Sequence, residues 1–318
     1  MKLVVLIPTY NEEKTIAQVI QDIPRNVEKI NEIEILVIDD GSADKTVSIA
    51  RNAGATVISY SKNKGLGFVF SRGIEEALKR GADILVNIDA DAQFNPKEIP
   101  KLIKPILEKK AEMVAGTRFE SKNSLSQIPF LKKWGNRVFT SLINILTREK
   151  FTDTQCGFRA YSREALLRLN LFGRFTYTQE VFLDLVNKGL KIEQIPITVR
   201  YYKERQAKIS ASFFRYFLQT IIIILRTFRD YKPLLFFGIP GVSIFGVGIL
   251  FWFYSFIYWL LHHQTTPIRM YFFVGTGLIT FGFLLLVLAF IADMLKRIRQ
   301  NQEEILYKLK KKEYEKSD

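Results

Sequence analysis

Two aspartates separated by one residue, Asp89 and Asp91, follow the apolar segment at residues 84–88. If that segment is a buried strand, both carboxylates stand at its carboxyl end while the side chain of Ala90 points the other way. Mg²⁺ and Mn²⁺ are usually held by one or two carboxylates with substrate phosphates completing the shell, and Gln93 offers a further oxygen. The pattern predicts a divalent-metal site that neutralises a departing diphosphate. A turn or helix cap is the alternative for an isolated Asp-x-Asp.

Other polar clusters follow apolar segments in the same way, and they are Pro8-Thr9-Tyr10-Asn11-Glu12, Asp39-Asp40-Gly41-Ser42 and Asn63-Lys64-Gly65-Leu66-Gly67. A carboxylate in the second cluster can accept hydrogen bonds from a ribose hydroxyl or a nucleobase edge, although an Asp-Gly turn followed by a cap explains the same residues. The third cluster brings a lysine and two glycines to a helix start, where backbone N–H groups and the helix dipole favour an anion.

Short apolar segments alternate with longer amphipathic ones from residue 2 to about residue 116, which predicts the elements that position these clusters. Strands are expected at residues 3–7, 33–38, 55–59, 84–88 and 113–116. Asn95 and Pro96 are typical of a helix start. The class is α/β, a doubly wound and mostly parallel sheet covered by helices on both faces. Such sheets bind ligands beyond the carboxyl ends of their strands, where all the clusters fall.

Length and composition limit what else the chain contains. A chain of 318 residues can hold one full α/β domain and something smaller. The single Cys156 excludes an intrachain disulfide and a cysteine-built zinc site, which favours a reducing compartment such as the cytosol. The net charge of +14 suits anionic lipid or a phosphorylated substrate better than nucleic acid, because no nucleic-acid motif appears.

Residues 234–261 and 270–292 contain no charged residue, and each segment exceeds the roughly 20 residues that a helix needs to cross a bilayer core. We expect two transmembrane helices, with buried core helices as the alternative. Cations flank the pair, namely Arg226, Arg229 and Lys232 before it and Lys296, Arg297 and Arg299 after it, against Arg269 between the segments. By the positive-inside rule, this predicts a multi-pass protein of the cell membrane with both termini cytoplasmic.

The chain therefore divides into four expected parts. They are a catalytic domain at 1–209, an interfacial amphipathic helix region at 210–232, two spans within 233–295, and a basic cytoplasmic tail at 296–318. Aromatic residues and arginines mix in the second part, as expected for a helix lying in the membrane interface. The tail is expected to begin as a helix with a weak apolar stripe of Ile305, Leu306 and Leu309, solvated or bound to lipid headgroups.

Taken in order, these clusters resemble the motifs of the inverting family-2 glycosyltransferases with a GT-A fold, and most of all the dolichyl-phosphate mannose synthases and polyprenyl-phosphate glucosyltransferases. The resemblance extends over residues 3–208 and includes Val37-Ile38 before Asp39, Gly116-Thr117-Arg118-Phe119 and Asp153-Thr154-Gln155-Cys156-Gly157-Phe158-Arg159-Ala160. It implies inverting transfer of a glycosyl residue to a polyprenyl or dolichyl phosphate in the bilayer. Mannose from GDP-mannose is the favoured donor and UDP-glucose the alternative.

The resemblance also implies roles for single residues. The nucleotide would be bound by Pro8, Tyr10, Glu12, Val37, Asp39, Lys64, Asp89 and Ala90, and the Mg²⁺ or Mn²⁺ ion by Asp89, Asp91 and Gln93. The catalytic residues would be Asp91, Arg118, Glu180, Arg205 and Lys208, with Arg118 facing phosphate.

Glu180 stands where many relatives carry a general base for a hydroxyl acceptor. A phosphate acceptor is already anionic near neutral pH, so we expect Glu180 to orient the sugar or a loop. Arg205 and Lys208 lie in a shortened motif and would grip phosphate. Lys132, Lys133 and Arg137 could do the same.

Two other functions stay open from the sequence. A processive polysaccharide synthase is disfavoured, because two spans leave little protein for a polymer channel and the Gln-Gln-Arg-x-x-Arg-Trp-type element is absent. A non-enzymatic membrane scaffold would bind nucleotides or anionic lipid through its basic surface without turnover.

Overall fold

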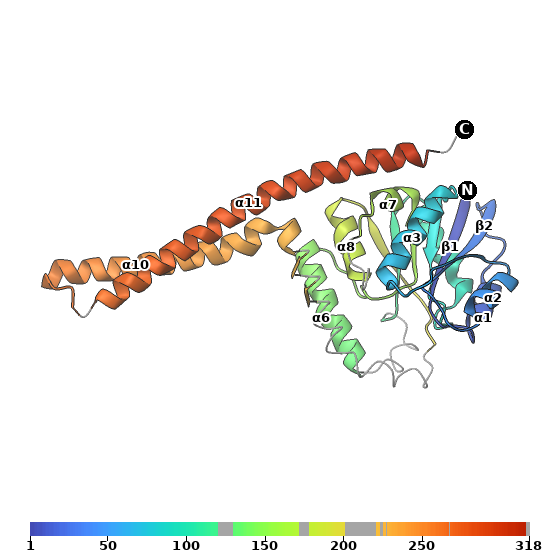
Figure 1. Cartoon of the computed structure of the whole chain (residues 1–318), viewed down its shortest axis with the longest axis horizontal. Helices are drawn as coiled ribbons and strands as arrows, with labels where there is room; N and C mark the ends of the chain where they lie inside the picture. Colours follow the sequence, from blue (N-terminus) through green and yellow to red (C-terminus); the bar gives the residue numbers. More distant parts are fainter. Residues whose placement is uncertain are drawn as a thin grey trace. The chain divides into compact units, whose positions relative to one another are not determined.

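The computed structural model describes residues 1–119, 130–171, 178–200, 221–222, 225–226, 228–266 and 268–315. The chain forms two compact units. The first unit is Met1–Ile224 together with Leu306–Asp318, and the second unit is Leu225–Ile305. Figure 1 shows the α/β elements of the first unit and the two long helices of the second.

The first unit is built on a seven-stranded sheet of order β3-β2-β1-β4-β6-β5-β7. All five predicted strands are present, as β1 (Lys2–Thr9), β2 (Glu32–Asp39), β3 (Thr56–Ser59), β4 (Ile84–Asn87) and β5 (Met113–Thr117). Two further strands were not predicted, namely β6 (Arg159–Ser162) and β7 (Ile192–Pro196). β6 lies between β4 and β5 and runs antiparallel to both, whereas the other neighbours pair in parallel. The sheet is therefore mixed, and it is mostly parallel as expected, with β6 as the antiparallel strand.

Strand residues alternate between two apolar layers, one on each face of the sheet. In β1, Leu3, Val5 and Ile7 belong to the first layer, and Val4 and Leu6 belong to the second. The first layer is covered by α1 (Ile16–Asp22), α2 (Thr46–Asn52) and α4 (Ile99–Leu107). The second is covered by α3 (Leu66–Lys79), α6 (Phe130–Thr147), α7 (Arg163–Arg168) and α8 (Thr178–Asn187). Because both faces are buried, the central strands form continuous apolar segments in the sequence.

The predicted helix start at Asn95 is confirmed. Its side-chain oxygen accepts a hydrogen bond from the Lys97 N–H at 3.1 Å, and Pro96 opens a short 3₁₀ turn, η1 (Pro96–Glu98), that leads into α4. The proline loses nothing there, because the first N–H groups of a helix have no partner within the helix. This turn fixes the chain that follows the Asp89–Asp91 pair.

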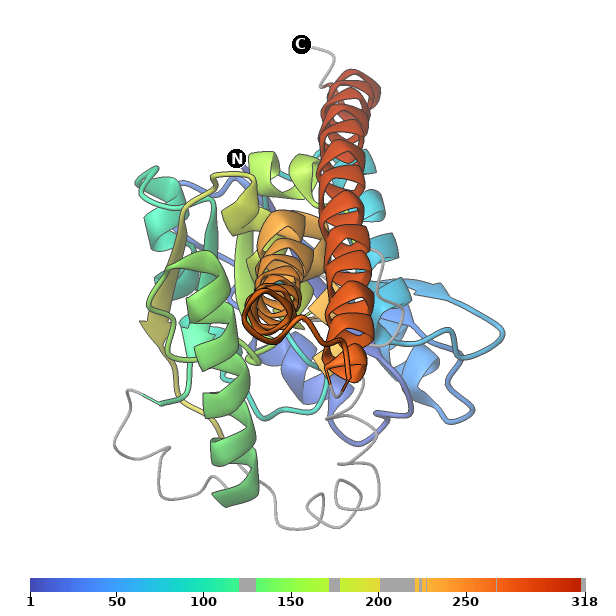
Figure 2. The ribbon, with the colours of Figure 1, turned by 90° about the vertical axis from the view of Figure 1, so that its left-hand side faces the viewer.

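The second unit contains a turn of π-helix, η4 (Leu234–Gly238), followed by α10 (Ile239–His262) and most of α11 (Arg269–Glu313). Both long helices are apolar and long enough to cross a membrane, and only 11% of the most apolar window of each is buried. A pair of core helices would instead bury most of that surface, so exposure on this scale favours a lipid environment. Figure 2 shows α10 and α11 side by side.

Small residues repeat every seven positions along the contact between these helices. They are Gly241, Gly248 and Ser255 in α10, and Gly275, Gly282 and Ala289 in α11. A Cβ added to Gly248 would lie 2.7 Å from the backbone nitrogen of Ile279 and 2.9 Å from the carbonyl oxygen of Gly275. Small side chains allow the backbones of membrane helices to approach closely, where packing rather than water drives association.

α11 continues without a break to Glu313, beyond the boundary expected at residue 295. Residues 201–220 and parts of 221–227 lie outside the described residues. The interfacial helix expected at 210–232 therefore falls largely outside the part of the chain that the structure describes.

Candidate active site

Asp89 and Asp91 follow β4 at the carboxyl-end rim of the sheet, and both are half-buried. Burial, and then the negative charge of Asp91, raises the pKa of the Asp89 carboxyl to about 7. The charges of Arg159 and Arg118 act in the opposite direction, and Glu12 adds to the rise. The charges of all four residues therefore act on the Asp89 carboxyl.

The position of Asp89 is set by the chain at Gly157. A Cβ on Gly157 would lie 2.8 and 3.0 Å from the two carboxylate oxygens of Asp89, and the Gly157 carbonyl accepts a hydrogen bond from the Asn87 side chain at 2.8 Å. The Gln93 N–H donates to Oδ1 of Asp91 at 3.1 Å. Backbone contacts on both sides therefore fix the two carboxylates.

The carboxylate pair suits a hard divalent cation. Two neighbouring carboxylates resist joint ionisation unless a positive charge joins them, and Mg²⁺ or Mn²⁺ takes oxygen ligands from one or two such groups. Among the described residues, no group of three or more His, Cys, Asp or Glu side chains is arranged to hold a metal. The residues present therefore fit an ion that takes its remaining oxygens from a substrate and from water, with Gln93 beside the pair.

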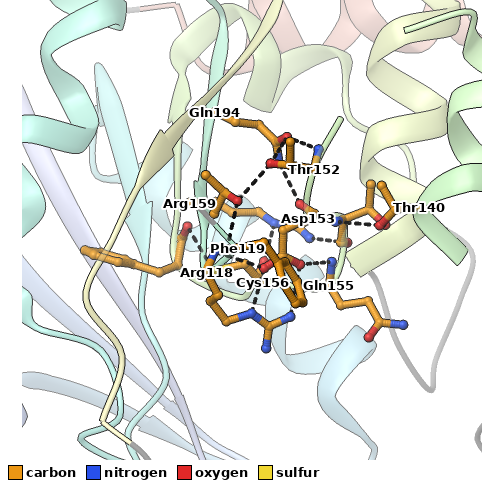
Figure 3. Close-up of polar contacts among 12 residues, drawn as sticks. Arg118, Phe119, Thr140, Thr152, Asp153, Gln155, Cys156, Arg159 and Gln194 are labelled. Carbon is orange, nitrogen blue, oxygen red and sulfur yellow. Dashed lines mark hydrogen bonds and ion pairs between the residues drawn. The ribbon is translucent and has the colours of Figure 1, made fainter. Parts of the chain in front are cut away.

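Arg118 follows β5, and its guanidinium is held by the carboxylate of Asp153 (Figure 3). Its Nε donates to Oδ2 of Asp153 at 2.6 Å and its terminal nitrogen donates to Oδ1 at 3.0 Å. Asp153 is fully buried, and its carbonyl accepts a hydrogen bond from Gln194 of β7 at 2.6 Å. Gln194 also accepts from the Thr152 N–H at 2.6 Å. Because two of its nitrogens bond to Asp153, the Arg118 guanidinium keeps its orientation. Its positive charge acts on the Asp89 carboxyl.

Arg159 is a buried cation whose role the sequence did not indicate. It lies in β6, is fully buried, and donates to the carbonyls of Cys156 at 2.7 Å and Thr154 at 3.0 Å. Its guanidinium lies 4.8 Å from the centre of the Phe182 ring. Burying such a charge is costly without compensating contacts, but β6 (Arg-Ala-Tyr-Ser) carries no sequence signal that Arg159 is buried. Arg159 shapes the loop that carries Asp153 and Gly157.

Residues expected to bind the nucleotide divide into two groups. Tyr10 is 48% exposed at the rim and Glu12 is half-buried near Asp89, as a binding role requires. Pro8 is buried in β1, and the side chains of Val37 and Ala90 pack in the first apolar layer. Their place in the nucleotide pocket stays a prediction.

Asp39 is fully buried and already has hydrogen-bond partners. Its carboxylate accepts from the backbone N–H and the hydroxyl of Ser42, and from the Ser59 hydroxyl at 2.6 Å. The turn reading of Asp-Asp-Gly-Ser thus accounts for contacts that were expected to go to a ribose or a base.

Asp40 fills the anion position expected at the start of α3. Its carboxylate accepts from the backbone N–H groups of Lys64 at 2.7 Å and Gly65 at 3.0 Å. These two donors already have a protein partner. The expected role of Lys64 in binding the nucleotide stays a prediction. The Lys64 ammonium lies 4.6 Å from the ring centres of both Tyr60 and Phe68.

A pocket of about 500 Å³ is lined by the sequence neighbours of Arg118 and Asp153. Phe119 and Thr152 line it on that side, and Lys133, Arg137 and Asn136 of α6 line the other. Asn136 is 2% exposed, and its side-chain oxygen has no hydrogen-bond partner among the described residues. A buried unsatisfied acceptor is costly, so a ligand with a hydroxyl or protonated oxygen would be favoured there.

Four further residues were predicted at the site, and the structure describes the side chain of only one of them, Glu180. Glu180 is half-buried in the first turn of α8. Arg205 and Lys208 lie outside the described residues, as does the side chain of Lys132.

Comparisons with known proteins identify the family and the fold. The model of glycosyl transferase family 2 matches residues 4–169. The chain is 31% identical over 223 residues to the UDP-N-acetylglucosamine–dolichyl-phosphate N-acetylglucosaminyltransferase of Methanococcus voltae, spanning 64% of this chain and 87% of that protein. It is 28% identical over 251 residues to the dolichol-phosphate mannosyltransferase of Pyrococcus furiosus, spanning 76% of this chain and 69% of that protein.

Among solved structures, the chain resembles glucosyl-3-phosphoglycerate synthase from Mycobacterium tuberculosis in complex with Mn²⁺, uridine diphosphate and glucosyl-3-phosphoglycerate. The TM-score is 0.55 at 24% identity, over 70% of this chain and 79% of that one. At this identity the likeness concerns the fold alone.

Proposed function

The chain belongs to glycosyltransferase family 2, and from that membership we propose that it transfers a glycosyl residue from a nucleoside-diphosphate sugar to the phosphate of a polyprenyl or dolichyl phosphate. The observation that carries the proposal is the Asp89–Asp91 pair beyond the carboxyl end of β4, with Gly157 packed against Asp89 and the Gln93 N–H bonded to Asp91. Asp89 and Asp91 can share a divalent cation, and Arg118 is held in place by Asp153. Positive charge of this kind stabilises a departing diphosphate.

Each group has a part in a single displacement. Asp89 and Asp91 would hold a Mg²⁺ or Mn²⁺ ion, which when bound supplies positive charge to the departing diphosphate. Arg118, oriented by Asp153, binds phosphate, and Glu180 orients the sugar or a nearby loop. An acceptor phosphate oxygen attacks the anomeric carbon as the nucleoside diphosphate leaves from the opposite face, so the configuration inverts. The solved structure that shares this fold is a complex with Mn²⁺ and uridine diphosphate.

The pocket lined by Lys133, Arg137 and Asn136 suits the acceptor side. Lys133 and Arg137 lie one helical turn apart and attract a phosphate monoester. Phe119, the residue after Arg118, also lines the pocket, as does Thr152. A phosphate monoester is ionised near neutral pH, so no general base is needed to make it a nucleophile. Arg205 and Lys208 remain proposed partners of the same phosphate.

The membrane segments supply the reason for a lipid acceptor. The exposed apolar surfaces of α10 and α11 favour insertion in a bilayer, where polyprenyl phosphates reside. The excess of cations outside the two spans supports cytoplasmic termini and a cytoplasmic catalytic unit. We use the term catalytic unit from here on for the first unit.

The donor sugar is the finer part of the proposal. Mannose from GDP-mannose is our first choice, supported by the relative from Pyrococcus furiosus, and UDP-glucose is the sequence-based alternative. The relative from Methanococcus voltae adds UDP-N-acetylglucosamine. The open rim at Tyr10 does not by itself select a base.

The test is a donor screen on the full chain in lipid nanodiscs. Labelled GDP-mannose, UDP-glucose and UDP-N-acetylglucosamine are each supplied with a polyprenyl phosphate, with and without Mn²⁺ or Mg²⁺. We expect label in the lipid fraction with one donor and only with metal. No label with any donor would contradict the proposal.

The Asp91→Ala variant separates an enzyme from a membrane scaffold. Transfer should be lost while the melting temperature stays near that of the unmodified protein, because Asp91 is half-buried and lies outside both apolar layers. Asp22→Ala, which removes an acid of α1 paired loosely with Lys97 at 3.9 Å, is the matched control and should retain transfer. A scaffold would keep its function in both variants. A lipid product that carries more than one sugar residue would instead favour a polysaccharide synthase.

A further inference from the structure

The end of α11 belongs to the catalytic unit, although the preceding part of the same helix belongs to the second unit. Leu306–Asp318 groups with Met1–Ile224, and α11 is uninterrupted from Arg269 to Glu313. The chain therefore connects the two units twice, once on each side of Leu225–Ile305. The second connection is a helix, and specific contacts made by that helix restrict its motion.

Tyr307 makes the first specific contact. Its hydroxyl donates to Oε2 of Glu164 at 3.0 Å, and the Arg168 guanidinium lies 4.1 Å from the centre of its ring. Glu164 and Arg168 are themselves an ion pair one turn apart on α7. Tyr307 also packs against the second apolar layer. One side chain thus combines a hydrogen bond, a cation–π contact and apolar burial.

Lys310 makes the second contact, at the carboxyl end of α7. Its ammonium donates to the carbonyl of Leu169 at 2.9 Å and to the side-chain oxygen of Asn170 at 3.0 Å. Leu169 is the residue after α7, and a cation there satisfies carbonyls that have no partner within the helix. Burial, and then the charge of Lys188, lowers the pKa of Lys310, which agrees with an enclosed ammonium.

Tyr314 completes the face. Its ring packs against the second apolar layer and its carbonyl accepts a hydrogen bond from the Arg163 guanidinium. Positions 307, 310 and 314 share one side of a helix, because their spacing of three and four residues matches the helical repeat. The same stretch carries three exposed lysines, Lys308, Lys311 and Lys312.

We propose that Tyr307, Lys310 and Tyr314 form a docking face by which the end of the second membrane helix holds the catalytic unit, and that efficient transfer to a bilayer-borne acceptor depends on this attachment. Holding an enzyme at two points raises the effective concentration of its site near a lipid-bound partner. The docking itself is independent of the reaction catalysed, whereas the effect on transfer rests on the proposed function.

The experiment compares two double variants of the full chain in nanodiscs of phosphatidylcholine and phosphatidylglycerol. Tyr307→Ala/Lys310→Ala removes the docking contacts, and Lys308→Ala/Lys311→Ala removes exposed lysines of the same segment. Amide hydrogen exchange is measured by mass spectrometry over residues 163–170 and 306–314. We expect exchange to accelerate by roughly tenfold or more in the docking variant and to stay unchanged in the control. The milder Tyr307→Phe and Lys310→Met variants should give smaller increases.

Transfer is then measured with two acceptors, a long polyprenyl phosphate in the nanodisc and a short isoprenyl phosphate added from solution. Loss of docking should lower transfer to the embedded acceptor severalfold and leave the soluble acceptor within about twofold. Unchanged exchange in the docking variant would overturn the docking face. Faster exchange with equal transfer to both acceptors would overturn its role in transfer. If the unmodified protein transfers no sugar, the proposed function fails, while the exchange comparison still decides the docking.

Discussion

Gly157 lies against Asp89 so closely that a Cβ at residue 157 would approach Oδ2 of Asp89 to 2.8 Å. Gly157 is not among the glycines with positive φ, so alanine can adopt its backbone conformation. The cost of Gly157→Ala therefore falls on the carboxylate. We expect the Kd for Mn²⁺ to rise by roughly 10- to 100-fold, as when the supports of a metal ligand are disturbed.

Titration calorimetry with Mn²⁺ on the full chain in detergent measures this change. The neighbouring Cys156→Ala variant is the control, because the Cys156 side chain belongs to the first apolar layer and does not touch Asp89 in the way Gly157 does. Equal Mn²⁺ affinity in Gly157→Ala and the unmodified protein would show that Asp89 does not hold the metal.

The Arg118–Asp153 pair predicts an asymmetric effect on stability. Arg118→Met leaves Asp153 fully buried without its guanidinium, which should lower the free energy of unfolding by about 3 kcal/mol. Adding Asp153→Leu removes the stranded charge, so the double variant should unfold at a higher denaturant concentration than Arg118→Met alone. Denaturant unfolding followed by circular dichroism compares the two. A double variant less stable than the single variant would argue against the pair as the source of the cost.

The sequence was sufficient to predict the strands that position the site. Residues 84–88 are apolar except for Asn87 because β4 is buried on both faces, and Asp89 follows at the rim. The same physics did not reveal β6, whose four residues include the buried Arg159, or β7, whose residues are only partly buried at the sheet edge. Neither has an apolar alternation long enough to recognise.

Contacts made inside the protein account for the rest of what was missed. The backbone donors at Lys64 and Gly65 looked available to a phosphate, yet Asp40 occupies them from 24 residues earlier in the chain. The apolar stripe expected in the tail is exposed, at 58%, 40% and 59% for Ile305, Leu306 and Leu309. The docking face consists of two tyrosines and a lysine. Because these side chains have polar ends, a hydrophobicity pattern does not identify them as buried residues.

The small-residue repeat of the second unit predicts that a larger side chain is harmful at Gly248 and tolerated at Gly246. Gly248→Leu would drive a side chain into the backbone of α11, because even a Cβ there meets Ile279 at 2.7 Å. Gly246, two residues earlier, has nothing within 4 Å of an added Cβ. We expect Gly248→Leu to lower the temperature of aggregation in detergent by several degrees and Gly246→Leu to leave it unchanged. Similar losses in both variants would contradict close packing of α10 on α11.

Cys156 predicts a pH response that can be measured without knowing the substrate. Burial, and then the charge of Asp153, raises the pKa of its thiol to about 12. Only the thiolate reacts with iodoacetamide, so roughly 0.1% of the thiol is reactive even at pH 9. The folded protein should therefore resist alkylation from pH 7 to pH 9, while the urea-unfolded chain reacts readily. A raised thiol pKa also means that stability is intact below about pH 9 and declines as the pH rises toward 12, because only the unfolded chain loses the proton in that range. Mass spectrometry counts the modified fraction at each pH. Alkylation of the native protein that rises steeply near pH 8.5 would mean that the loop from Asp153 to Gly157 is open to solvent, and the fixed geometry described for Arg118 and Asp89 would not hold.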